Sequence, residues 1–178
     1  GAHGISSPGG SLVVNGCTSL VNSQNGIDAG PGCTISNTIA GGNTQNGISV
    51  GSASTLIGNT VRLNGLDGIL GATGNTIRGN TCVGNGNTGD SAGIHVTGGD
   101  NRIEDNNCTT ADRGIDVDVA GNFIVRNTCA GNGQNWAVVG GNVIGPVVDR
   151  TAPGNVAING NSGLSTLSST EPNANFTY

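Results

Sequence analysis

The chain has 178 residues, a formal net charge of −5 at pH 7 and only six cationic side chains, all of them arginine. So few cations leave no basic stripe of the kind that nucleic-acid binding requires, and no apolar run approaches the length of a membrane span. We therefore expect no nucleic-acid partner and no membrane insertion. The 34 glycines, the many asparagines and the absence of methionine favour turns over helix interiors.

A phrase that returns about every 21 residues runs through most of the chain. Its first part is a Gly-Ile dipeptide whose first six copies are separated by 21 to 25 residues. These copies begin at Gly4, Gly26, Gly47, Gly68, Gly93 and Gly114, with Ala137-Val138 as a degraded seventh. A fixed period of this length is typical of architectures that stack one structural unit on the next. One interval is longer than the others, which predicts an insertion into a single turn at residues 85–91.

Each repeat contains short segments in which apolar and polar residues alternate, such as Ile94-His95-Val96 and Ile115-Asp116-Val117. This alternation indicates strands with one buried face, and no segment has the apolar spacing of an amphipathic helix. Leucine-rich repeats of similar period need several leucines per unit, which this chain lacks. We therefore predict an all-β, single-stranded parallel β-helix of about seven coils, each with three short strands. At about 4.8 Å per coil, the rod is roughly 33 Å long.

Stacking the coils places equivalent residues in columns along the rod axis. One predicted inward column is Ile5, Ile27, Ile48, Ile69, Ile94, Ile115 and Val138, and a second is Cys17, Ile39, Val61, Cys82, Cys108 and Cys129. Because cysteine shares the second column with isoleucine and valine, we expect free thiols that act as small buried hydrophobes. A third column is Asn15, Asn37, Asn59, Asn80, Asn106 and Asn127. It predicts an asparagine ladder that hydrogen-bonds along the axis at a coil corner.

The repeated motif Asn-x-Ile-x-x-Asn-x-Cys, most plainly written in residues 75–82, together with Gly-Ile-x-Val, resembles a known family of repeats. It is similar to the parallel β-helix repeat of the pectin-lyase-like superfamily, in particular its NosD-like, periplasmic copper-binding-type members. The similarity covers residues 4–145 and implies a right-handed coil in a secreted, cell-surface or periplasmic protein. The superfamily includes polysaccharide lyases, glycoside hydrolases, surface proteins and chains with no known activity. The fold alone therefore does not choose among these functions.

The repeat fades after residues 142–144, which divides the chain into a β-helix domain at 1–145 and a C-terminal capping segment at 146–178. Trp136, Phe176 and Tyr178 lie at or beyond the last coil. We expect them to cover the open apolar end or to form an intersubunit contact. At the other end the first coil begins within the repeat, so we expect a longer parent chain or a homo-oligomer contact, such as a trimer, to cover it.

The densest group of ionisable residues is predicted on one outward strand face. His95 and Asp116 occupy the same position of adjacent coils, and Asp118 lies two residues further along. Arg113 is near this patch, but the sequence does not assign its direction. These residues suit the acid and base of an inverting glycosidase, a Ca²⁺ site, or a transition-metal site through His95. A solvated polar surface is the simpler interpretation.

Other charged residues align between neighbouring coils. Arg78 aligns with Glu104, and Asp105 aligns with Arg126, one coil apart in each case. The alignment predicts two cross-coil ion pairs on the surface.

No complete catalytic motif is present. The Asn-Thr-Asp, Asp-Asp, Gly-His-Gly and Arg-Ile-Lys motifs of pectin-degrading hydrolases of this fold are absent, and without lysine a lyase would depend on an arginine. We therefore expect an extracellular or envelope module that presents a long face to a glycan or a partner. The alternative is a carbohydrate-active enzyme, a polysaccharide lyase or glycoside hydrolase, that uses Asp116, Asp118, His95 and Arg113. An insertion at 85–91 that rises beside His95 would form one wall of a groove.

Overall fold

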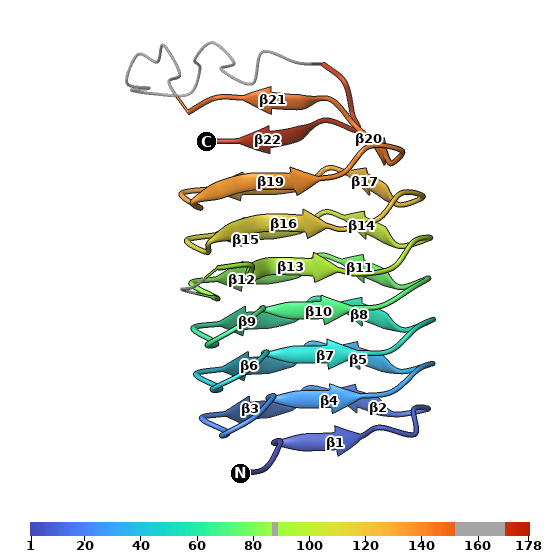
Figure 1. Ribbon diagram of the computed structural model, residues 1–178, viewed down its shortest axis with the longest axis vertical. Coiled ribbons are helices and arrows are strands. Elements are labelled where there is room, and N and C mark those ends of the chain that lie inside the picture. The colour runs from blue at the N-terminus through green and yellow to red at the C-terminus, as the bar shows by residue number, and fades with distance from the viewer. Residues whose placement is uncertain (87–88, 152–169) are drawn as a thin grey trace, which may run out of the picture.

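A computed structural model describes residues 1–86, 89–151 and 170–178, and it confirms the predicted fold. The chain is a right-handed parallel β-helix in which about seven coils stack along one axis (Figure 1). Every regular element in the described ranges is a strand. None of these segments is a helix of the length and apolar character that crossing a membrane requires.

Three parallel sheets, which we name A, B and C, run along the rod, and each coil contributes one strand to each sheet. Sheet A contains β1 (Ile5–Ser7), β4 (Ile27–Ala29), β7 (Ile48–Val50), β10 (Ile69–Gly71), β13 (Ala92–Val96), β16 (Arg113–Val117) and β19 (Gln134–Val138). Sheet B contains β2 (Val13–Asn15), β5 (Thr34–Ser36), β8 (Thr55–Ile57), β11 (Thr76–Arg78), β14 (Arg102–Glu104), β17 (Phe123–Val125) and β20 (Val143–Ile144). Sheet C contains β3 (Thr18–Leu20), β6 (Ile39–Gly41), β9 (Thr60–Arg62), β12 (Thr81–Val83), β15 (Asn107–Thr109), β18 (Thr128–Ala130), β22 (Asn175–Thr177) and β21 (Val147–Asp149).

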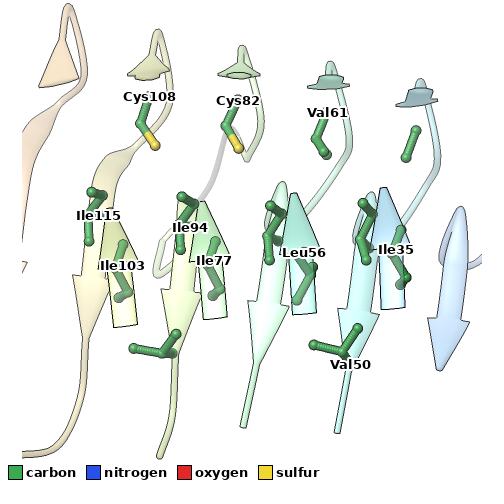
Figure 2. Packing of buried hydrophobic residues seen from close by; sticks show 14 of the residues in the cluster. Ile35, Val50, Leu56, Val61, Ile77, Cys82, Ile94, Ile103, Cys108 and Ile115 are labelled. Carbon is green, nitrogen blue, oxygen red and sulfur yellow. The ribbon is translucent and has the colours of Figure 1, made fainter. Parts of the chain in front are cut away.

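The core is a set of stacked aliphatic columns, as the alternation in sequence predicts. Ile69, Ile94 and Ile115 are in register in sheet A, and all are fully buried. Ile77 and Ile103 stack in the same way in sheet B (Figure 2). Each strand is only two to five residues long, so one or two inward side chains per strand, such as Ile94 and Val96 of β13, carry most of the burial. The stacking of like residues on like residues fixes the register between coils.

The cysteine column differs from the prediction at its N-terminal end. The register of sheet C places Ser19 and Ala40, and not Cys17 and Ile39, in the column of Val61. Cys82 and Cys108 follow in that column as predicted (Figure 2), and Cys129 comes next. These three are fully buried, and all five cysteines are free. The prediction was wrong in the first two coils because it counted two residues on from Asn15 and Asn37, and neither of these asparagines occupies the ladder position.

The last member of the isoleucine column was also wrong. Trp136, and not Val138, pairs with Ile115, while Val138 pairs with Val117. The degraded Gly-Ile phrase at Ala137 therefore lies two positions out of register with the other copies. Trp136 packs partly buried against the aliphatic core, so an indole ends this column.

The asparagine ladder exists, with a corrected beginning. In coils four to six, each ladder asparagine accepts two hydrogen bonds from the equivalent asparagine one coil earlier, and its own Nδ2 donates to a backbone carbonyl. For Asn80, the side-chain oxygen accepts from the backbone N–H of Asn59 at 3.0 Å and from its Nδ2 at 2.9 Å, and Nδ2 of Asn80 donates to the carbonyl of Leu56 at 3.0 Å. Cys17 and Thr38 occupy the position in the first two coils, since the backbone N–H of Cys17 donates to Thr38 Oγ1 and that of Thr38 donates to Asn59 Oδ1. Asn15 is an exposed strand end, and Asn37 adopts a left-handed φ of 52° at the corner.

Two further asparagine ladders lie at other turns of the coil, where the sequence columns did not predict them. In both, the side-chain oxygen of each later member accepts from the backbone N–H of the asparagine one coil earlier, although the Nδ2 of Asn75 has no hydrogen-bond partner among the described residues. One ladder is Asn22, Asn43, Asn64 and Asn85, and the other is Asn75, Asn101, Asn122 and Asn142. The abundance of asparagine therefore satisfies the backbone N–H groups that each buried corner would otherwise leave unpaired.

The C-terminal segment closes sheet C as a strand. β22 pairs with β18 on one side and with β21 on the other, so the last residues lie inside the sheet (Figure 1). Asn175 extends the asparagine ladder beyond Asn127, and Thr177 Oγ1 accepts a hydrogen bond from the indole of Trp136 at 2.7 Å. The tail folds back as expected, but Phe176 occupies the outward column beside Thr128, and Tyr178 is 57 % exposed. The inward positions are polar: Asn175 continues the asparagine ladder, and Thr177 follows the buried Cys129 and bonds the indole of Trp136.

Candidate functional site

The predicted patch lies on the outward face of sheet A, where β13 and β16 are longer than the strands of earlier coils. His95 and Asp116 are paired in register between these strands. Both side chains are nearly buried, with residue exposures of 9 % and 3 %, although they point away from the core. Outward groups of this kind are shielded from water by neighbouring side chains and interact more strongly than exposed pairs.

The imidazole of His95 lies among three carboxylates. Its Nε2 is 3.1 Å from Asp118 Oδ2 and 3.9 Å from Asp116 Oδ2. Its Nδ1 faces Asp67 Oδ2 at 3.4 Å. The structure therefore brings His95, Asp116 and Asp118 together as predicted, and it adds a fourth residue.

Asp67 was missing from the predicted site. It precedes the Gly-Ile phrase of its coil, where two earlier coils have Asn25 and Asn46. These asparagines form a ladder in which the side-chain oxygen accepts from the backbone N–H of the next coil, and Asp67 continues it by accepting from the N–H of Ala92 at 2.7 Å. Its second oxygen is thereby directed at His95. The sequence held a signal for this residue. In the column that precedes each Gly-Ile phrase, Asp67 replaces the asparagine of earlier coils, and the next coil contains His95.

Arg113 belongs to the same column as Asp67, and its direction is now assigned. Its Nη1 contacts Asp116 Oδ2 at 2.5 Å and also contacts the carboxylate of Asp90. Asp90 comes from the predicted insertion, which in the structure begins after Asn85, because Asn85 remains a buried ladder residue. Residues 87 and 88 lie outside the described residues. All four predicted site residues thus lie in one cluster with Asp67 and Asp90.

The cluster favours a protonated His95. Asp67 raises the pKa of His95 most strongly, ahead of Asp118 and Asp116, and together they overcome the effect of burial and bring it to about 9. Asp67 has the larger effect despite its longer distance because its side chain is buried, whereas that of Asp118 is 44 % exposed. At neutral pH the imidazole therefore carries a proton and a positive charge.

The donor atoms are spaced for a metal ion. One ligand atom each from His95, Asp116 and Asp118 lies within 4.8 Å of the others. An imidazole with carboxylates suits a first-row transition metal better than Ca²⁺, which takes six to eight oxygen ligands. The same separation is shorter than the roughly 6.5–9.5 Å between the two carboxyl groups of an inverting glycosidase.

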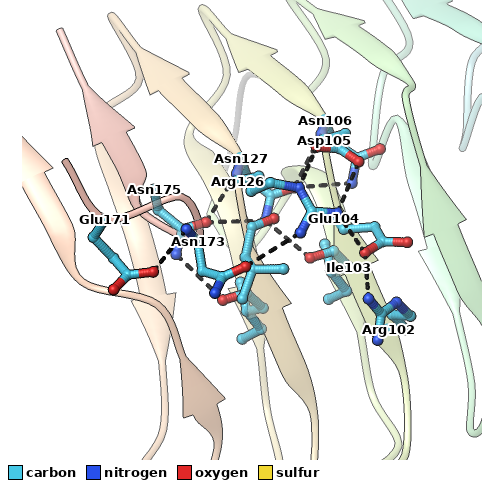
Figure 3. Close-up of polar contacts among 12 residues, drawn as sticks. Arg102, Ile103, Glu104, Asp105, Asn106, Arg126, Asn127, Glu171, Asn173 and Asn175 are labelled. Carbon is cyan, nitrogen blue, oxygen red and sulfur yellow. Dashed lines mark hydrogen bonds and ion pairs between the residues drawn. The ribbon is translucent and has the colours of Figure 1, made fainter. Parts of the chain in front are cut away.

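A second charged cluster lies on sheet B and continues to the C-terminal segment (Figure 3). Glu104 pairs with Arg102 at 2.7 Å and with Arg126 at 2.8 Å, and Arg126 also pairs with Asp105 at 2.7 Å. The Asp105–Arg126 pair was predicted, whereas Glu104 was expected to pair with Arg78. Arg102 lies instead over the ring of Phe123, with its guanidinium carbon 4.8 Å from the ring centroid, and holds Glu104 within its own strand. Each acid is matched by arginine, so this cluster is a structural network.

Comparison with known families gives one match. A family model described as "Periplasmic copper-binding protein (NosD)" matches residues 10–170, which is most of the chain. No curated protein matches the chain, and no solved structure does.

Proposed function

The chain belongs to the NosD family of periplasmic copper-binding proteins, and from this premise we propose that it is a β-helix module that binds a divalent transition-metal ion, copper(II) first among them, on the outward face of sheet A. The residues that would hold the ion are His95, Asp116 and Asp118. The observation that supports this proposal most directly is the position of His95, with Asp67 on Nδ1 and the other two carboxylates around Nε2.

Asp67 has the role of an orienting residue in this proposal. Histidines that bind metals usually donate the N–H of the other ring nitrogen to a carboxylate or carbonyl, which fixes the tautomer and the ring orientation. Asp67 is held by the backbone N–H of Ala92 through one oxygen and faces Nδ1 through the other. Nε2 is then the nitrogen left for the ion.

The donor types suit copper(II) rather than copper(I). Nitrogen and oxygen donors select copper(II), whereas copper(I) prefers thiolates and thioethers. The chain has no methionine, and Cys33, Cys82, Cys108 and Cys129 are buried. When bound, the ion supplies a divalent positive charge to a face where carboxylates outnumber cations.

The proton on His95 makes binding depend on pH. The metal competes with this proton for the imidazole. Because the pKa of His95 is about 9, most protein molecules carry the proton at neutral pH and must release it when the metal binds. The apparent affinity should therefore rise about tenfold per pH unit between pH 6 and pH 8.

The test is Cu²⁺ binding by isothermal titration and electron paramagnetic resonance. All variants should be made in a His3→Gln background, because His3 is the other histidine of the chain and lies 3.8 Å from Asp28. The parent should bind Cu²⁺ with hyperfine coupling from a single imidazole nitrogen. His95→Gln should abolish this signal, and Asp116→Asn with Asp118→Asn should weaken binding by about a hundredfold or more. Binding that persists unchanged in His95→Gln would contradict the proposal.

A second candidate function is binding of a glycan or a protein partner along the same face. It is favoured by the insertion, which brings Asp90 to the cluster and gives this one coil additional surface. A panel of neutral and acidic polysaccharides, with and without Ca²⁺, tests it through binding and through mass spectrometry of any fragments. Unsaturated fragments would indicate a lyase, saturated fragments a hydrolase, and retention without fragments a binding module.

A further inference from the structure

Arg113 forms an ion pair with the oxygen of Asp116 that would bind a metal ion. Its Nη1 lies 2.5 Å from Asp116 Oδ2, and this is the same oxygen that lies 3.9 Å from His95 Nε2. The same nitrogen also contacts Asp90, which comes from the insertion. The guanidinium is thus shared between a carboxylate inside the candidate site and one beside it.

The two carboxylates differ in their need for a cation. The side chain of Asp116 is 4 % exposed, whereas that of Asp90 is 72 % exposed. A buried carboxylate without a counter-ion is costly, while an exposed one is stabilised by water. Asp116 therefore requires a cation at all times, and Asp90 can accept or release Arg113 with little change in free energy.

From this geometry we propose that Arg113 is an internal counter-ion that competes with the metal for Asp116, and that Asp90 draws it away when the metal binds. The inference rests on the metal site proposed above and adds its regulation. The insertion then has a defined role, because Asp90 sets how readily Asp116 becomes available. Arg113 acts on binding by positioning and competition and is not a ligand.

The alternative is a simple electrostatic effect without exchange of partners. In that case Arg113 lowers the affinity for a cation, Asp90 raises it, and each does so independently of the other. In the exchange proposed here, Asp90 acts only through Arg113. A double-mutant cycle separates the two cases.

The experiment measures Cu²⁺ affinity at pH 7.5 and low salt in the His3→Gln background. Arg113→Gln should bind about tenfold more tightly than its parent, and Arg113→Lys, which keeps the charge, should stay within about threefold. Asp90→Asn should bind about tenfold more weakly when Arg113 is present. Combined with Arg113→Gln, Asp90→Asn should change the affinity by less than about twofold.

Two results would overturn the inference while leaving the metal site intact. These are an Arg113→Gln variant that binds no more tightly than its parent, and an Asp90→Asn effect of equal size in both backgrounds. A parent that does not bind Cu²⁺ would remove the proposed function and this inference together. Melting curves of every variant show whether an altered affinity reflects loss of folding.

Discussion

Asparagines that look equivalent in the repeat have different roles in the structure. Asn15 lies exposed at the end of β2, where its side-chain oxygen accepts from Ser36 and Asn37. Asn80 is 1 % exposed and joins three successive coils through Asn59 and Asn106. The period identified the ladder in its central coils but not in the first two, because a column in the sequence does not show which side of a corner a side chain faces.

Because Asn80 is a buried ladder residue and Asn15 is exposed, replacement by alanine should lower the free energy of unfolding more at Asn80 than at Asn15. Asn80→Ala should lower the free energy of unfolding by about 3 kcal/mol, because it leaves the N–H of Asn59 and the carbonyl of Leu56 without their partner in the core. Asn15→Ala, the matched control, should stay within about 0.5 kcal/mol of the unmodified protein. Chemical denaturation measures both. Equal losses would show that the ladder position carries no special stability.

At the level of elements, strands β14 and β17 are joined by the arginine network on sheet B (Figure 3). The side chain of Glu104 is 6 % exposed and lies between Arg102 and Arg126. Arg102 above all, and Arg126 after it, lower the pKa of Glu104 below its ordinary value. Comparison of the repeats predicted that Glu104 pairs with Arg78, because the two occupy equal positions of successive coils. That comparison ignored Arg102, which lies on the same strand as Glu104.

This network predicts a pH-dependent contribution to stability. Because the folded pKa of Glu104 is lowered, its contribution is fully present above the unfolded value of about 4.3 and is lost as pH falls through the folded value. Glu104→Gln should therefore lower Tm at pH 7, and the difference from the unmodified protein should shrink below about pH 4. Asp100→Asn, at an exposed corner, serves as the control and should leave the profile unchanged. A Tm difference for Glu104→Gln that is constant from pH 7 to pH 3 would exclude a role for its charge.

At the level of the whole molecule, a stack of coils is stable only if its ends are covered. β22 covers one end of sheet C by entering the sheet beside β18. Asn175 supplies the last ladder acceptor to Asn127 at 2.9 Å, and Thr177 holds the indole of Trp136. The sequence predicted a cap from the position of the aromatics, whereas the structure assigns much of it to polar residues of a strand.

Removal of this strand should destabilise the whole rod. Deletion of residues 175–178 should lower the free energy of unfolding by about 3 kcal/mol or more, since Asn127 loses its partner and the edge of β18 becomes exposed. Deletion of Tyr178 alone, which is 57 % exposed, is the control and should change little. Thermal unfolding followed by circular dichroism measures both. Similar Tm values for the two deletions would mean that β22 does not stabilise the end of the helix.

The sequence by itself determined the architecture and the neighbourhood of the site. A period of about 21 residues with alternating apolar positions has one economical solution, stacked parallel coils, because each short strand can bury its one or two apolar side chains only on an equivalent strand. The same columns placed His95 beside Asp116. Only the tertiary structure decided that Asp67 faces His95, that Arg113 lies on Asp116 and that Asp90 shares this arginine. These contacts depend on the direction of outward side chains and on a turn of irregular length, which the burial of the core does not constrain.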